Sequence, residues 1–476
     1  MPFDLSTATQ YKAKSSTVQD KRPPPLSYHW PIGPINEAAA SNTTQSIYPM
    51  KIDPSRIEEH NARGDESHRP RFSALGDVLE RAGHHVPTLL EKVAALQIAI
   101  PSWALGTGGT RFGRFPGGGE PRSLEEKIAD VGLLHALNRS SGTISLHIPW
   151  DIPEDTAAIQ ALAKEHQLSF DAVNSNTFQD QGDQARSYKF GSLAHTDPAV
   201  RQQAIHHNQE VIRYGELLGS KALTVWLADG SCFPGQQNFR RAFERTLESL
   251  QEIYAALPSD WRLLVEYKPY EPNFYSTVIQ DWGSSHMLAS KLGEQAYSLV
   301  DLGHHLPNTN IEQIVALLMM DGKLGGFHFN DSKYGDDDLT VGSIKPYQLF
   351  LIFSELVAGM EDPASVNPTP AWMIDASHNV KDPLEDLLQS VEAIKIAYAQ
   401  ALLVDRTQLE ALREENDASG AQELLQDAFR TDVRPLLAEA RKNAGAALYP
   451  FRLYRDLGVR ETLIRQRGRQ TLSTGL

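Results

Sequence analysis

The sequence predicts an α/β protein built on a single (β/α)₈ TIM barrel, with an N-terminal extension before the barrel and a helical extension after it. Two observations predict this fold. Eight short apolar or alternating segments recur between residues 95 and 380, and most of the stretches between them are amphipathic and begin with helix-start signals. The repeating region is close to the length of about 250 residues that is typical of such barrels.

The eight segments are the expected strands. They lie at residues 95–103, 143–150, 168–176, 221–230, 261–271, 296–305, 324–333 and 370–380. Helix-start signals lie between them: Ser123 and Glu126 have the spacing of a capping box, and Asp197 precedes a proline at the first helical position. An open, doubly wound sheet is the competing arrangement, but eight nearly regular units favour closure into a barrel.

Three regions are expected along the chain. Residues 1–52 contain the run Pro23-Pro24-Pro25 and have no sustained apolar period, which is typical of a flexible or loosely docked extension. The barrel with the catalytic site is expected over residues 53–380, where a helical stretch at 54–95 leads into the first strand. Residues 381–476 are strongly helical and exceed what the last barrel helix needs, so we expect them to pack on the barrel or in oligomer contacts.

Composition excludes several classes of function. The 476 residues carry a net charge of −15, whereas a nucleic-acid-binding protein needs a basic surface. Cys232 is the only cysteine, which rules out a disulfide within the chain and a cysteine-based zinc site. The sequence has no secretion signal and no apolar run of membrane-spanning length, so we expect a cytoplasmic protein without a membrane partner.

The expected strand ends are rich in carboxylate and imidazole groups. The last four strands and the loops that follow them contain Glu266, Asp301, His304, His328, Asp336, Asp338 and Asp375. In a barrel the carboxyl ends of the strands meet at one face, where such charges would repel one another in a shared cavity. A divalent cation resolves this repulsion, and mixed oxygen and imidazole ligands suit Mn²⁺, Co²⁺, Mg²⁺ or Zn²⁺.

Charge counting favours two ions over one. The five carboxylates less the one positive charge of Lys268 leave four negative charges, which two divalent cations neutralise. The competing interpretation of residues 336–338 is a solvated acidic loop. Lys268 lies two residues after Glu266 on the same face of its strand, so it is expected to hydrogen-bond a substrate oxygen or to serve only as a counter-ion.

An aromatic group is expected at the ends of the earlier strands. Trp103, Trp150 and Trp226 follow the first, second and fourth strands, where they are candidates to contact the carbon–hydrogen faces of a sugar or to pack in the core. His147 ends the second strand and is a candidate for proton transfer to a ring oxygen. The glycine-rich loop at 106–122 fails the dinucleotide and P-loop patterns and is interpreted as a lid that offers Arg111, Arg114 and Phe115 for contacts.

Eight segments that run through all the expected strand ends are similar to one known family. They are IPSWALGTGGTRFGRFPG, SLHIPWD, NSNTF, SKALTVWLADGS, YEPNFYSTVIQDWG, LVDLGHHLPNTNIE, GGFHFNDSKYGDDDL and MIDASHNV. Together they resemble the broad-specificity bacterial L-rhamnose isomerases, which belong to the xylose-isomerase-like barrels. The resemblance covers about residues 56–450 and leaves out the N-terminal extension.

The resemblance implies a homotetramer with two divalent ions per subunit, Mn²⁺ first among the candidates. It implies that one ion is held by Glu266, Asp301, His328 and Asp375, and the other by Asp301 as a bridge with His304, Asp336 and Asp338. It places Lys268 at the substrate O1 or O2, His147 at the ring oxygen, and Phe115 on a loop that reaches a neighbouring subunit. Tyr267 departs from the family pattern, which has His between the metal-binding Glu and the Lys.

The predicted function is therefore a metal-dependent interconversion of L-rhamnose and L-rhamnulose, and of related unphosphorylated sugars, by a hydride shift between C1 and C2. Lys268, His147 and Asp338 are the expected catalytic side chains. Proton transfer through an enediol is the alternative mechanism. A ketose 3-epimerase of the same barrel superfamily is the alternative function, followed by a metal-dependent endonuclease, which the net charge disfavours, and a non-catalytic binding protein.

Overall fold

The computed structural model describes residues 50–108, 113–270, 276–378, 380–471 and 473. Ser46–Leu476 form one compact unit, and the other unit, Met1–Gln45, lies outside the described residues. The expected extension at 1–52 therefore lies almost entirely outside the described residues. Among the described residues no single helix is long and apolar enough to cross a membrane, although the helices Pro383–Ala401 and Arg406–Glu414 pass that test together as a pair bent by 64°.

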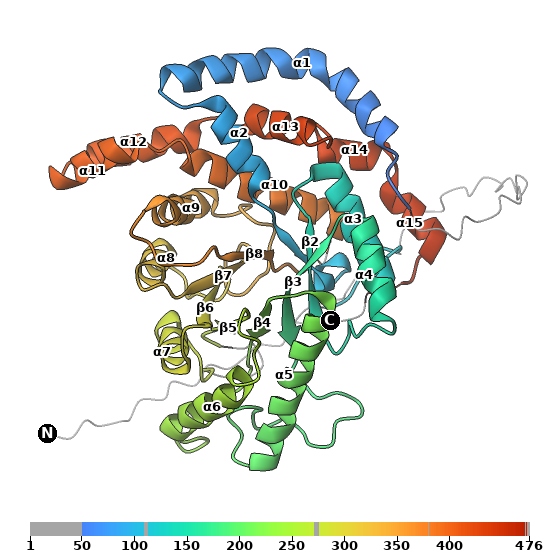
Figure 1. Ribbon diagram of the computed structural model, residues 1–476, viewed down its shortest axis with the longest axis vertical. Helices are drawn as coiled ribbons and strands as arrows, with labels where there is room; N and C mark the ends of the chain where they lie inside the picture. Colours follow the sequence, from blue (N-terminus) through green and yellow to red (C-terminus); the bar gives the residue numbers. More distant parts are fainter. Residues whose placement is uncertain (1–49, 109–112, 271–275, 379, 472, 474–476) are drawn as a thin grey trace, which may run out of the picture. The chain divides into compact units, whose positions relative to one another are not determined.

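Eight parallel strands close into a barrel in sequence order, with each expected segment contributing one strand (Figure 1). The strands are β1 (Ala99–Pro101), β2 (Thr143–Ile148), β3 (Ser169–Ser175), β4 (Ala222–Val225), β5 (Arg262–Glu266), β6 (Ala296–Asp301), β7 (Leu324–Phe329) and β8 (Ala371–Ile374). Pairing of Ala99 with Met373 joins the first strand to the last. The predicted barrel is confirmed, and the open-sheet alternative is wrong.

Helices surround the barrel, and caps predicted from the sequence begin two of them. The helices are α1 (Pro54–Arg81), α2 (Val86–Ala95), η1 (Ser102–Leu105), α3 (Leu124–Asn138), α4 (Thr156–Glu165), α5 (Pro198–Leu218), α6 (Phe239–Tyr254), α7 (Trp282–Leu292), α8 (Ile311–Met320), α9 (Pro346–Glu361) and α10 (Pro383–Ala401). Ser123 accepts a hydrogen bond from the Glu126 amide, and Asp197 accepts one from the Ala199 amide. The Glu126 carboxylate accepts from the Arg122 amide, which differs from the reciprocal bond of a capping box.

The C-terminal extension consists of α11 (Arg406–Glu414), α12 (Ala418–Arg430), α13 (Arg434–Asn443), α14 (Pro450–Asp456) and α15 (Val459–Arg467). The first three of these helices share a hydrophobic cluster with α1 and α2, and the group lies outside the barrel helices next to α10 (Figure 1). Because this cluster is buried within one chain, it anchors the extension to its own barrel. Contacts of the extension with a second subunit stay a prediction.

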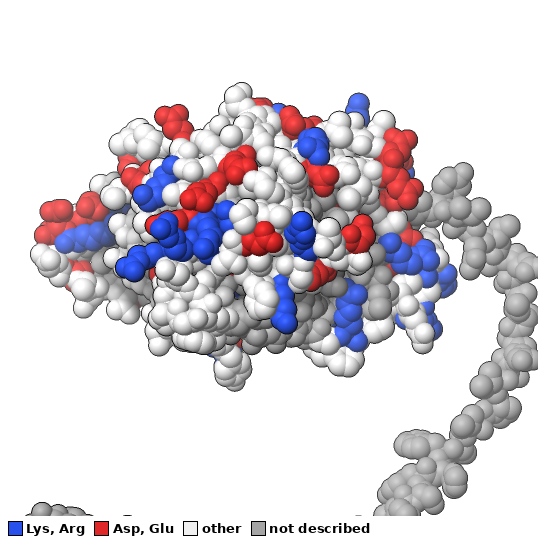
Figure 2. Space-filling model, turned by 90° about the horizontal axis from the view of Figure 1, so that it is seen from below, with Lys and Arg blue, Asp and Glu red and all other residues white. Residues whose placement is uncertain are grey.

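The barrel interior and its outer layer are packed separately. Side chains from five strands form a small cluster that we place inside the barrel: Ala172, Ala222, Leu264, Leu299 and Ala371. A much larger cluster joins the strands to the surrounding helices. On the face seen in Figure 2, Lys and Arg side chains lie among Asp and Glu side chains, which is the ordinary distribution of a solvated surface.

Candidate metal centre

The carboxyl ends of β5, β6 and β7 bring three buried side chains together. Glu266 is the last residue of β5, Asp301 is the last residue of β6, and His328 lies one residue before the end of β7. One ligand atom from each lies within 4.8 Å of the others. His328 Nδ1 is 3.1 Å from Glu266 Oε1 and 3.7 Å from Asp301 Oδ2. The strand register produces this proximity, because Asp301 pairs directly with His328.

Asp301 also belongs to a second group, which it forms with His304 and Asp336. His304 Nε2 is 3.4 Å from Asp336 Oδ2, and His304 Nδ1 is 2.9 Å from the main-chain oxygen of Tyr267. A ring nitrogen that faces a carbonyl oxygen must donate to it, so the neutral ring keeps its lone pair on Nε2. This is the tautomer that a metal-binding histidine adopts when its other nitrogen is held by a carbonyl.

Two buried polar atoms of the first group have no hydrogen-bond partner within the described part of the chain. These are Asp301 Oδ2 and His328 Nε2. By contrast, Asp301 Oδ1 accepts from the Gly303 amide at 2.7 Å and from Asn330 Nδ2 at 2.9 Å. An unsatisfied buried polar group costs about 1–3 kcal/mol, which a cation bound between these atoms would offset. Carboxylate oxygens and imidazole nitrogens in this arrangement fit a divalent transition metal.

The pKa shifts in the two groups also show that buried carboxylate charge is only partly offset. Burial raises the pKa of Asp301 to about 6. Burial would lower the pKa of both histidines, but Asp301 and Asp336 raise that of His304 to about 9. Glu266 likewise raises the pKa of His328 to about 9. Ring protons therefore offset part of the carboxylate charge, and a divalent cation would replace those protons.

Asp338 and Asp375, the other two predicted ligands, lie outside both groups among the described residues. Asp375 follows β8, and its Oδ1 accepts a hydrogen bond from Trp103 Nε1 at 2.8 Å. Asp338 has a left-handed backbone with φ of 48°, and its Oδ2 accepts from Ser377 Oγ at 3.0 Å. Five of the seven predicted ligands are therefore grouped, and these two are held nearby by neighbouring loops.

Lys268 lies beside the second group. Its Nζ atom is 2.8 Å from Asp336 Oδ2, and the side chain is 2% exposed. The same ammonium lies 5.0 Å from the centre of the Trp226 ring, a cation–π distance. Lys268 thus lies between Asp336 and Trp226. This position suits both roles expected for it, a counter-ion to the carboxylates or a hydrogen-bond donor to substrate.

The aromatic residues predicted at the earlier strand ends form a continuous wall with His147. The ring centres of Trp103 and Trp150 lie 5.1 Å and 4.7 Å from that of His147. Phe178 extends the wall, 5.6 Å from His147 and 4.5 Å from Trp226. Burial lowers the pKa of His147 to about 3, so its ring is neutral at physiological pH.

Sequence reasoning did not single out Phe178 and Asn330 as site residues. Phe178 follows the end of β3 and Asn330 directly follows β7. Their position after a barrel strand was the available signal, because all strand ends meet at one face. Phenylalanine and asparagine carry no charge, so charge counting could not find them.

The described residues of the glycine-rich loop contribute no side chain to the two groups. Arg111 lies outside the described residues. Phe115 is 68% exposed, and the guanidinium of Arg114 donates to the main-chain oxygen of Ser473 at 3.2 Å. Glu120 in the same loop accepts hydrogen bonds from Thr107 and from the Ser473 amide. Ser473 therefore ties the loop to the C-terminal part of the chain, and Phe115 does not reach the two groups.

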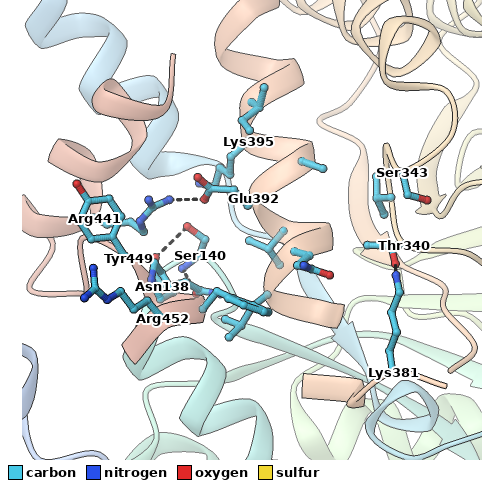
Figure 3. A pocket seen from close by; sticks show the side chains of 18 of the residues that line it. Asn138, Ser140, Thr340, Ser343, Lys381, Glu392, Lys395, Arg441, Tyr449 and Arg452 are labelled. Carbon is cyan, nitrogen blue, oxygen red and sulfur yellow. Dashed lines mark hydrogen bonds and ion pairs between the residues drawn. The ribbon is translucent and has the colours of Figure 1, made fainter. Parts of the chain in front are cut away.

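A separate cavity of about 750 Å³ lies along α10 (Figure 3). Its walls include Thr340, Lys381, Glu392, Arg441 and Tyr449. Arg441 forms an ion pair with Glu392, and Lys381 donates to Thr340. None of the predicted site residues lines this cavity.

Comparison with known proteins assigns this barrel to a family. The family described as xylose isomerase-like TIM barrel matches residues 140–348. A probable sugar isomerase of Rhizobium meliloti is 54% identical over 418 residues, which cover 88% of this chain and 97% of that protein. A probable sugar isomerase of Mesorhizobium japonicum is 52% identical over 419 residues, with the same coverage. The chain belongs to this family of sugar-isomerase-type TIM barrels.

A solved structure of an L-ribulose 3-epimerase has a weaker similarity to this chain. It aligns with a TM-score of 0.47 at 14% sequence identity, over 67% of this chain and 98% of that protein. This similarity is too low to assign chemistry.

Proposed function

We propose that this protein is a metal-dependent aldose–ketose isomerase that interconverts L-rhamnose and L-rhamnulose and acts on related unphosphorylated sugars. The observation that supports it is the pair of ligand groups sharing Asp301 at the carboxyl face of the barrel. The names of the two rhizobial relatives, both probable sugar isomerases, support the reaction class. The resemblance of the strand-end segments to L-rhamnose isomerases supports the choice of sugar.

Two divalent ions per subunit are part of this proposal, with Mn²⁺ preferred over Co²⁺, Mg²⁺ and Zn²⁺. Glu266, His328 and Asp375 would hold one ion, His304, Asp336 and Asp338 would hold the other, and Asp301 would contact both. The unsatisfied Asp301 Oδ2 and His328 Nε2 support the first position. The Nε2 atom of His304, turned toward Asp336, supports the second.

The proposed chemistry moves a hydrogen between C1 and C2 of the open-chain sugar. Bound divalent ions would polarise the oxygens on these two carbons and so favour transfer as hydride. Lys268 would donate a charged hydrogen bond to O1 or O2 of the sugar, because its ammonium contacts Asp336, one of the proposed metal ligands. Asp338 would act beside it as a carboxylate able to hold a proton of a sugar hydroxyl.

The aromatic wall would bind the sugar and open its ring. Trp103, Trp150 and Trp226 would contact the carbon–hydrogen faces of the substrate and exclude water. His147 would lie at the ring oxygen, where one nitrogen of its ring can donate a hydrogen bond and the other can accept one. Burial lowers its pKa to about 3 and so keeps the ring neutral. Phe178 joins His147 to Trp226 and would complete this surface.

The test is incubation of the purified protein with L-rhamnose and several other aldoses, with and without EDTA, followed by detection of ketose. We expect a ketose that disappears with EDTA and returns with Mn²⁺. No metal-dependent ketose from any aldose would overturn the proposal. Inversion at C3 of an added ketose, without aldose formation, would assign the 3-epimerase reaction instead. Incorporation of tritium from solvent at C1 of the ketose would show that the reaction follows the enediol route and not the hydride shift.

A homotetramer is proposed from the same resemblance. The exposed side chain of Phe115 supports it, because a loop that reached a neighbouring site would leave this ring uncovered in a single chain. Light scattering coupled to size-exclusion chromatography gives the oligomeric state directly. A monomer with full activity would exclude a role for Phe115 in another subunit's site.

A further inference from the structure

The junction between β8 and β1 has the shortest ladder in the barrel. One residue pair joins these strands, whereas two to five pairs join the other neighbours. Two proposed site residues, Trp103 and Asp375, lie on opposite sides of this junction and are linked by a hydrogen bond. Because one pair fixes little of the geometry, other contacts must set how these two side chains meet.

His378 crosses this junction. Its ring Nε2 lies 2.9 Å from the main-chain oxygen of Ala104, and its main-chain oxygen accepts from the Gly108 amide at 2.6 Å. Ala104 directly follows Trp103, and His378 is 2% exposed. The loop after β8 therefore holds the segment that carries Trp103.

Asp386 holds the His378 ring from the other side. Its Oδ2 is 2.7 Å from His378 Nδ1, and both side chains are almost completely buried. Because both ring nitrogens face acceptors, rotation of the ring would break at least one contact. Burial opposes ionisation of Asp386, but the hydrogen bonds from His378 and Thr340 hold its pKa below the usual range. Its place in the first turn of α10 also favours a negative charge.

The same carboxylate reaches the loop after β7. Asp386 Oδ1 accepts hydrogen bonds from Thr340 Oγ1 and from Lys381 Nζ, the second at 3.1 Å. Thr340 and Lys381 lie at one edge of the cavity in Figure 3. Thr340 is two residues beyond Asp338, which is itself bonded to Ser377. One buried carboxylate thus links the loops after β1, β7 and β8.

We propose that His378 and Asp386 form a positioning pair for the metal centre, an inference that rests on the proposed function. The pair fixes the three loops that carry Trp103, Asp338 and Asp375, and so sets the approach of these side chains to Asp301. Neither member is a proposed metal ligand or substrate contact. Loss of such outer contacts typically weakens metal binding by about 10–100-fold.

The experiment compares three variants with the wild-type protein. Asp386→Ala removes the link to all three loops. His378→Gln keeps a side-chain N–H for Ala104 and loses the bond to Asp386. Asp130→Asn is the matched control, because Asp130 is a buried carboxylate that accepts hydrogen bonds from Arg467 and, among the described residues, has none with His378 or Asp386. The readouts are the Mn²⁺ dissociation constant from an EPR titration, kcat and KM for L-rhamnose, and Tm in EDTA.

We expect Mn²⁺ binding to weaken by about 10–100-fold in Asp386→Ala and by about 10-fold in His378→Gln. The kcat at subsaturating Mn²⁺ should fall accordingly and recover with excess Mn²⁺. Asp130→Asn should lower Tm and leave the Mn²⁺ dissociation constant unchanged. The contrast between the two pair variants and the control separates positioning of the metal ligands from a general loss of stability.

Wild-type Mn²⁺ affinity in both His378→Gln and Asp386→Ala would overturn the positioning role while leaving the proposed function intact. If Asp386→Ala does not fold, His378→Gln decides by itself. A wild-type protein that binds no Mn²⁺ would contradict the proposed function, and the positioning role with it. Weaker Mn²⁺ binding in Asp130→Asn equal to that in His378→Gln would also overturn it, because any buried ion pair would then have the same effect.

Discussion

The two halves of the barrel mouth satisfy their buried carboxylates in different ways. In the half formed by β1–β4, Asp229 accepts hydrogen bonds from Ser192 and Ala194, and Asp151 is bonded to Lys127 and Ser102. In the half formed by β5–β8, Asp301 keeps a buried oxygen without a hydrogen-bond partner among the described residues.

This difference separates structural carboxylates from proposed ligands. Burial raises the pKa of both Asp229 and Asp301, so burial alone does not distinguish them. What differs is how many oxygens have donors. Main-chain amides bond both oxygens of Asp229, whereas only Oδ1 of Asp301 accepts hydrogen bonds and the carboxylate otherwise faces Glu266, His304 and Asp336. The charge of a carboxylate that faces other carboxylates must be offset by a cation or by protonated imidazoles, whereas amide donors already satisfy a carboxylate that they surround.

The largest effect is expected from Asp301→Asn compared with Asp229→Asn. Loss of the shared ligand should weaken Mn²⁺ binding by at least about 100-fold and abolish measurable turnover, because both ion positions lose a charge. Asp229→Asn should lower stability and leave Mn²⁺ affinity as in the wild type. Calorimetric titration measures the Mn²⁺ affinity of each variant. Equal losses of affinity would show that the carboxylates of the two halves contribute equally to metal binding.

Lys268→Met should lower kcat by about 10²–10⁴-fold, the range for a positioned proton or hydrogen-bond donor. The change removes the ammonium that faces Asp336. Steady-state kinetics at saturating Mn²⁺ give the loss. If kcat changes less than about threefold, Lys268 is a counter-ion only, which is the alternative that the sequence left open.

Metal removal should lower Tm in the wild-type protein. A ligand present at 100 times its dissociation constant stabilises the folded state by about 2.7 kcal/mol, because only the folded chain has the assembled site. Thermal unfolding with Mn²⁺ and with EDTA measures the shift. The shift should vanish in Asp301→Asn and persist in Asp229→Asn, and a shift of equal size in both variants would place the bound ion elsewhere.

Phe178→Leu should change substrate binding without changing metal binding. Truncating one aromatic ring of the wall should raise KM for L-rhamnose by roughly tenfold, which corresponds to about 1.4 kcal/mol and lies within the range for aromatic contacts. Mn²⁺ affinity should stay at the wild-type value. A loss of Mn²⁺ affinity in this variant would mean that the two halves of the mouth are coupled.

The last prediction concerns the neutral ring of His147, whose effect is absent at neutral pH and appears only at acidic pH. Its folded-state pKa of about 3 lies below the ordinary value of 6.5, so only the unfolded chain takes up this proton as the pH falls below about 6.5. This ring therefore lowers the free energy of unfolding by up to about 1.4 kcal/mol per pH unit below that point. Urea unfolding at pH 7 and pH 5 should show a smaller pH dependence in His147→Asn. An unchanged dependence would mean that the ring has the same pKa in the folded and the unfolded chain.

Much of the fold and of the site could be predicted from local patterns. Apolar segments at near-regular spacing predicted the eight strands, because a strand buried on both faces must be apolar. The polar residues that end β5 to β7 broke this pattern, so Glu266, Asp301 and His328 were visible without a structure. The ligand roles of these residues stay proposals.

The sequence by itself determined which side chains stand at the strand ends, because strand periodicity and the barrel rule place them at one face. Only the tertiary structure decided which of them meet: that Asp301 joins both ligand groups, that Phe178 completes the aromatic wall, and that Asp386 reaches three loops. The physical reason is that these contacts join residues far apart in the chain. Their distances depend on strand register and helix packing, which no local pattern specifies.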